Sequence, residues 1–243
     1  MSDRTVEQIA EAIDDCRGAS IRVEEQCLVS TLQIVDYNRL SLEEDYGKLR
    51  QDASRGESPP VSPECELEFL QSFRNYVSSL YTLYEHGKRY RNKFFCSHTA
   101  DGDTCEECDT VNLDSLRDTG VLPEWTLIKK LRVYTDHYRL PLLRGHLAFV
   151  GDDVGRENLL TLNRDGEIVL NEQRFLAWAD ETNNRDADDY VADADEIAPV
   201  TTALELYDAQ EEYYQWLFTE VEDRNREELD EYNRLVRELK SKV

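Results

Sequence analysis

The sequence has 243 residues, with 52 Asp or Glu against 28 Lys or Arg, which gives a formal net charge of −24. This length can bury a hydrophobic core, and 13 Tyr, 7 Phe and 3 Trp exclude a wholly disordered chain. The charge excludes a generally basic coat for nucleic acid. The sequence shows neither a run of about eighteen apolar residues nor a signal-peptide pattern, so we expect a soluble cytoplasmic protein without a membrane partner.

Acidic residues occur in nearly every segment, and Arg supplies most of the cations. A surface of this kind is similar to that of halophilic proteins, because in molar salt the Debye length falls to about 3 Å and like charges hardly repel. The alternative is one acidic face that binds a basic partner. Because the acids are spread along the whole chain, we expect mainly adaptation to salt.

The N-terminal residues 1–51 are predicted to be helical. Four apolar residues share one face of a first helix: Val6, Ile9, Ala10 and Ile13. Gly18 is expected to interrupt it, and the apolar positions of the following helix are Val23, Cys27, Thr31, Ile34 and Val35. Ser41 followed by Glu44 predicts a capping box that opens a short continuation to Leu49.

Residues 52–63 contain three prolines and read as a linker. Ser62 and Pro63 then predict the N-cap and first position of a helix of about thirty residues. Its expected apolar stripe is Leu67, Leu70, Phe73, Val77, Leu80 and Tyr84. A further helix is expected to start near Pro123 and to end before Pro141, so residues 64–140 form the central helical region.

The pattern changes over residues 145–170. Three short apolar runs, at 147–150, 159–162 and 168–170, are separated by polar turn sequences. Asp165-Gly166 between the last two runs predicts a β-hairpin. We therefore expect a small antiparallel β-meander inserted between helices.

Residues 171–243 are predicted to return to helix, first from Asn171 through Trp178 and then from near Pro199. The last helix has the apolar stripe Leu204, Tyr207, Tyr214, Leu217, Phe218 and Val221. Its end carries Leu229, Tyr232, Val236 and Leu239 at coiled-coil spacing, which suits a homodimer or a partner helix. The expected fold is one mainly α domain over 1–243, a helical bundle with a β insert.

A cluster of metal-ligating residues follows the long central helix, within the loop 96–108. Cys96 and His98 precede the pair Cys105 and Cys108, whose spacing places two thiolates in one tight turn. Four such ligands suit a structural Zn²⁺ that clamps the loop. A redox or disulfide pair and cysteines without a special role remain the alternatives. The remaining cysteines, Cys16, Cys27 and Cys65, are expected in the core.

A basic island precedes this cluster and contains Lys88, Arg89, Arg91 and Lys93 without an acid. Aromatic residues interleave these cations, as in surfaces on which single-stranded nucleic acid stacks, so the four are candidate RNA-binding residues. The alternative is a helix C-terminus whose cations complement the helix dipole.

The segment LIKKLRVYTDHYRLPLL places Arg132 five residues before His137. This spacing resembles the R-x4–6-H signature of the HEPN superfamily (higher eukaryotes and prokaryotes nucleotide-binding). The resemblance implies a helical bundle, often dimeric, with metal-independent RNase activity in toxins and defence systems. Arg132 would then bind the scissile phosphate, and His137 would serve as general acid and base. The alternative is a structural helix in which Arg132 pairs with Asp136.

Two functions follow from these patterns. The first is an HEPN-like endoribonuclease that acts through Arg132 and His137. The second is a non-catalytic helical interaction or regulatory protein of a halophile, stabilised by zinc.

Overall fold

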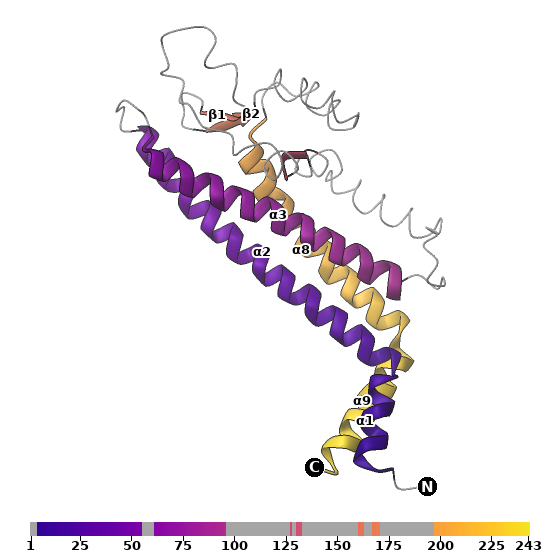
Figure 1. Cartoon of the computed structure of the whole chain (residues 1–243). Coiled ribbons are helices and arrows are strands. Elements are labelled where there is room, and N and C mark those ends of the chain that lie inside the picture. Colours follow the sequence, from indigo (N-terminus) through magenta and orange to yellow (C-terminus); the bar gives the residue numbers. More distant parts are fainter. Residues whose placement is uncertain are drawn as a thin grey trace. The chain divides into compact units, whose positions relative to one another are not determined.

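The computed structural model describes residues 4–54, 61–95, 127, 130–132, 160–162, 167–170 and 197–243. Figure 1 shows that long helices dominate this part of the chain, which confirms a mainly α helical bundle. Contacts divide the described residues into two compact units. The first holds 4–33, 83–95 and 211–243, and the second holds the described residues of 34–82 and 115–210. Outside the described residues lie the predicted cysteine cluster, His137, the run 147–150 and the helix 171–178.

The first helix, α1 (Val6–Asp14), agrees with the prediction and starts with a capping box between Thr5 and Gln8. The chain breaks at Asp15 and Cys16, so Gly18 lies inside the next helix, α2 (Arg17–Ser54). Gly18 was therefore wrongly expected to be the break. A Cβ on Gly18 would lie 2.3 Å from the backbone oxygen of Glu228, so this glycine permits a close approach between two segments.

The helix α2 is continuous, and no new helix starts at Ser41, whose hydroxyl donates to the Tyr37 carbonyl at 3.1 Å. The expected stripe was partly wrong, because Val23 and Ile34 are 63% and 56% exposed and Cys27 is also exposed. The buried apolar residues instead recur at every seventh position: Ile21, Leu28, Val35, Leu42 and Leu49. This is one column of a heptad repeat.

The helix α3 (Pro63–Phe94) starts as predicted, since the Ser62 hydroxyl accepts from the Cys65 N–H at 3.2 Å. It buries two columns at seven-residue spacing, which are Phe69, Tyr76, Leu83 and Tyr90, and Phe73, Leu80, Gly87 and Phe94. Leu67, expected in the core, is 57% exposed.

Polar contacts fix the antiparallel register of α2 and α3. In the first unit, Lys93 pairs with Glu24 at 3.0 Å, and His86 Nδ1 lies 2.9 Å from the Thr31 hydroxyl. In the second unit, the Ser72 hydroxyl donates to the Asp45 carboxylate at 2.7 Å. From Glu24 to Thr31, a step of seven residues along α2 matches a step of seven back along α3, as knobs-into-holes packing requires.

The helix α8 (Pro199–Arg224) starts where the sequence predicts and runs parallel to α3. In the second unit, the Tyr76 hydroxyl donates to the Ala203 carbonyl at 3.0 Å. In the first, the Tyr214 hydroxyl donates to the Leu83 carbonyl at the same distance. The expected continuous last helix is broken at Asn225, whose side chain donates to the Phe94 carbonyl at 3.0 Å.

The C-terminal helix α9 (Arg226–Lys240) contacts α1. Leu229 and Leu235 are buried, and the Lys242 ammonium donates to the Arg4 carbonyl at 2.6 Å. The apolar seam predicted for a second chain is therefore in contact with α1 of the same chain.

The strands β1 (Leu160–Leu162) and β2 (Ile168–Leu170) pair antiparallel, with Leu162 opposite Ile168. This confirms the predicted hairpin. It is held in the second unit, where the Leu170 N–H donates to the Ile197 carbonyl at 2.9 Å. Among the helices that the structure describes, none is long and apolar enough to cross a membrane.

Candidate functional site

The four cations of the basic island lie at the end of α3 in different surroundings. Lys88 and Arg89 are exposed, whereas Lys93 forms the ion pair with Glu24. Arg91 is only 3% exposed, and its guanidinium donates to the Asn92 side-chain oxygen at 3.1 and 3.2 Å. The structure therefore leaves two of the four predicted RNA-binding residues free of a described ion pair and well exposed.

Arg91 also lies beside Tyr213. Burial raises the pKa of the Tyr213 hydroxyl, and the nearby Arg91 guanidinium partly offsets that rise. An arginine enclosed in this way supports the packing of α3 against α8 and is not presented to a ligand.

Arg132 lies in the second unit, on a short helical stretch whose Leu127, Lys130 and Leu131 are buried. Its guanidinium carbon is 4.1 Å from the centroid of the Tyr81 ring, which is cation–π distance. The Tyr81 ring thus orients the guanidinium plane. Because His137 lies outside the described residues, a joint Arg132–His137 site stays a prediction.

The four candidate zinc ligands Cys96, His98, Cys105 and Cys108 also fall outside the residues that the structure describes. Within the described ranges, no group of three or more His, Cys, Asp or Glu side chains is arranged to hold a metal ion. The zinc site thus stays a prediction.

One surface that the sequence reasoning missed is the side of α2 opposite its buried column. It consists of eleven residues in three adjacent heptad columns, and we call it the α2 outer face. Its members are Ala19, Gln26, Gln33 and Leu40; Ser20, Cys27, Ile34 and Ser41; and Val23, Ser30 and Tyr37. It holds four of the large exposed apolar residues in the described part of the chain: Val23, Ile34, Tyr37 and Leu40.

The α2 outer face has no charged residue, although 33% of the sequence is charged. Eleven uncharged positions would arise in about one case in a hundred if charges were placed at random, and more rarely on a surface, where charged residues gather. This absence of charge is the signal that the sequence contained, and it becomes readable only once the buried column of α2 is known.

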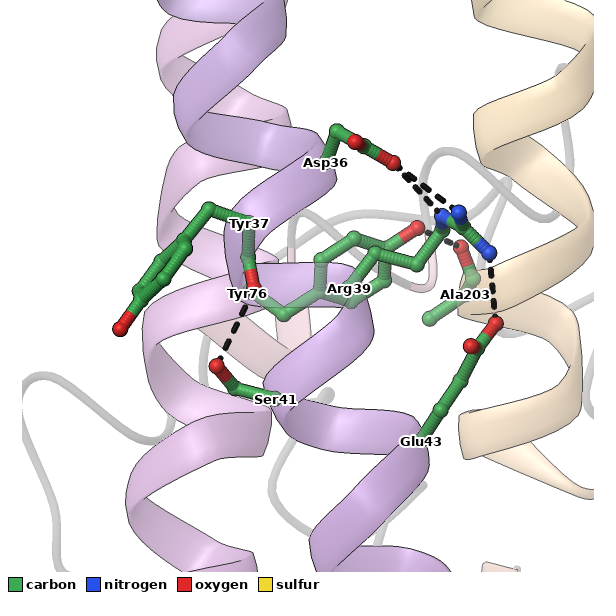
Figure 2. A network of polar contacts seen from close by, with 7 residues as sticks. All are labelled: Asp36, Tyr37, Arg39, Ser41, Glu43, Tyr76 and Ala203. Carbon is green, nitrogen blue, oxygen red and sulfur yellow. Dashed lines mark hydrogen bonds and ion pairs between the residues drawn. The ribbon is translucent and has the colours of Figure 1, made fainter.

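The polar atoms of this face are largely satisfied within the helix. The Ser30 hydroxyl donates to the Gln26 carbonyl at 2.8 Å, and Ser41 donates to Tyr37. Figure 2 shows the Tyr37 side chain directed away from Tyr76 and Ala203, while Arg39 lies on the other side of α2 between Asp36 and Glu43. Because the two hydroxyls already have acceptors, covering them costs little hydrogen bonding.

The nearest charges beside the face are themselves paired. Asp36 accepts from Arg39 at 2.9 Å, and Glu24 accepts from Lys93 at 3.0 Å. The flanks of the α2 outer face are thus locally neutral in a chain of strongly negative net charge.

No protein-family model, curated protein or solved structure is similar enough to this chain to count as a match.

Proposed function

We propose that the chain is a non-catalytic helical interaction protein that binds a partner helix through the α2 outer face. The observation that supports this proposal is an exposed strip containing Val23, Ile34 and Tyr37 without a single charge, in a protein whose surface is otherwise rich in acids. Contiguous exposed apolar patches on soluble proteins commonly mark interaction sites.

The energetic argument is direct. Fully burying a large apolar side chain contributes about 1.5–3 kcal/mol, and this strip offers four that are more than half exposed. The spacing of its columns, in steps of three and four residues, is the spacing at which one helix packs along another.

The native thiol of Cys27, at the centre of the face, allows a test that does not require the partner to be known. Maleimide labelling of Cys27, followed by peptide mass mapping, is compared between intact cells and dilute purified protein. We expect labelling in cells to be at least about tenfold slower, because a bound helix covers the thiol. Ile34→Glu should remove this protection, and equal labelling of the unaltered protein in both settings would contradict the proposal.

A second candidate is the metal-independent endoribonuclease acting through Arg132 and His137. The observation that favours it is the oriented guanidinium of Arg132, 4.1 Å from the Tyr81 ring, since a fixed guanidinium suits binding of a phosphate. The test is incubation with RNA in EDTA at high salt, beside His137→Ala. Cleavage by the unaltered protein alone supports the enzyme, whereas equal or absent cleavage in both proteins removes it.

A further inference from the structure

We infer that the helix bound by the α2 outer face is the same face of a second copy of this chain, in antiparallel orientation. This inference rests on the proposed function and adds the identity and direction of the partner. It is carried by the self-complementary order of large and small residues along the face, and by its lack of charge.

The order of residues becomes clear when two copies are laid head to tail with the columns interleaved. In a heptad seam, one column takes the a positions (Ser20, Cys27, Ile34 and Ser41) and another takes the d positions (Val23, Ser30 and Tyr37). Placing the a residues of one copy against the d residues of the other sets Val23 opposite Ile34 of the second copy. By the two-fold symmetry, each such pair occurs twice.

The same register matches bulky residues with small ones. Tyr37, which is 72% exposed, faces Ser20 of the second copy, and Leu40 at the edge faces Ala19. Large side chains over small ones let the two helices approach closely along their length.

The polar positions are also compatible in this register. Gln26 at the edge faces Gln33 of the second copy, and each amide has a donor and an acceptor to exchange. At the centre, Cys27 faces Ser30. No acid is brought against another acid within the seam, because the face contains none.

Charge favours a second copy at this face over association elsewhere on the chain. Two copies each carry −24, so contact through a typical part of the surface brings like charges together. The α2 outer face, flanked by the ion pairs of Asp36 and Glu24, avoids that repulsion.

The expected dimer is weak. The face extends over about 33 Å of helix and is about 10 Å wide, which is small beside the roughly 800 Å² that each partner buries in a standard interface. We therefore expect a dissociation constant on the order of micromolar or weaker. The dimer should tighten as salt rises from about 0.01 M to about 1 M, because screening removes the remaining net repulsion.

The first experiment is sedimentation of the full chain over a range of concentrations at both salt levels. We expect a monomer–dimer equilibrium that shifts to dimer in high salt. Ile34→Glu should weaken it at least about tenfold, whereas Leu67→Glu should leave it unchanged. These variants are matched, since the two side chains are 56% and 57% exposed and only Ile34 lies on the face. Unchanged circular dichroism in both variants excludes unfolding as the cause.

The second experiment tests the orientation. A variant carrying both Ser30→Cys and Cys27→Ser is mixed with the unaltered protein under mild oxidation, and disulfides are identified by peptide mass. The antiparallel register predicts a bond between Cys27 of one copy and the introduced cysteine of the other, formed only in the mixture. A parallel pair would instead link like positions in each protein alone, and that result would overturn the inference.

The two proposals fail differently. A chain that stays monomeric at all concentrations and salt levels overturns the dimer. If Cys27 is nonetheless protected in cells, a different helix covers the face and the interaction function stands. A Cys27 that is equally reactive in cells and in dilute purified protein removes both proposals.

Discussion

The ring of Tyr214 fills the space beside Gly87: a Cβ on that glycine would lie 2.3 Å from Cε1 of the ring. The ring cannot easily withdraw, because the Tyr214 hydroxyl donates to the Leu83 carbonyl at 3.0 Å. Contact between α3 and α8 at this level thus depends on the absence of a side chain at residue 87.

Gly87→Ala is therefore expected to lower the free energy of unfolding by about 1–3 kcal/mol, although alanine favours a helix by about 1 kcal/mol. Gly47→Ala is the matched control in α2, where nothing lies within 4 Å of the added Cβ. It should stabilise by about 0.5–1 kcal/mol. Urea denaturation measures both changes, and a stabilising Gly87→Ala would contradict the described packing.

Four buried tyrosines should make the fold sensitive to alkali. Burial raises the pKa values of Tyr76, Tyr90, Tyr213 and Tyr214 above the ordinary value of 10.0. Above about pH 10 the unfolded chain loses these protons and the folded chain keeps them, so the free energy of unfolding falls as pH rises. Below that pH the contribution is intact.

The expected loss is about 1.4 kcal/mol per pH unit for each fully protected tyrosine. Urea denaturation between about pH 9 and pH 11 measures the slope, and Tyr214→Phe should reduce it by one tyrosine's share. An unchanged slope in that variant would show that Tyr214 does not resist ionisation.

The contact between Thr31 and His86 should couple α2 to α3. The Thr31 hydroxyl donates to the Cys27 carbonyl at 2.9 Å, so its oxygen is left to accept from His86 Nδ1–H. A double-mutant cycle of Thr31→Val and His86→Leu is expected to give a coupling free energy of about 0.5–1.5 kcal/mol. The exposed Thr219, whose hydroxyl bonds only within α8, provides the control cycle with a coupling near zero.

The enclosed position of Arg91 predicts a structural effect for a residue that the sequence placed among the RNA contacts. Arg91→Ala should lower the free energy of unfolding by about 2 kcal/mol through lost packing, whereas Lys88→Ala on the exposed side should change it by less than about 0.5 kcal/mol. Thermal and urea denaturation of the two variants provide the comparison. Equal stability would place Arg91 on the surface.

The cysteine cluster predicts about one equivalent of zinc per chain in protein purified without chelator. Metal analysis measures the content, and replacing Cys105 and Cys108 together by Ser should abolish it. Less than about half an equivalent in the unaltered protein would exclude the clamp.

Helix positions followed from local signals, since Thr5, Ser62 and Pro199 start helices where capping and proline chemistry predict. The buried side of α2 did not follow, because that helix carries two apolar stripes, one through Leu28 and one through Ile34. Which stripe is inside depends on α3 and α8, which lie far away in the sequence. The break at Asn225 was equally hidden, because its cause is the distant carbonyl of Phe94.

For the candidate sites, the sequence located cations and could not tell their surroundings. Arg91 and Lys93 are two residues apart, yet one is buried beside Tyr213 and the other pairs with Glu24 on the surface. Such differences arise from the rotation of 100° per residue combined with the neighbouring helices, so a cluster in sequence need not be a cluster in space.

The heptad columns of α2, α3 and α8 also set a rule for changes in chain length. Inserting seven residues into α2 would restore the buried column beyond the insertion, but it would leave α3 and α8 one repeat short. Length in this fold can therefore change smoothly only in steps of two helical turns, made together in all three helices. Any other insertion or deletion within them would turn the α2 outer face toward the core.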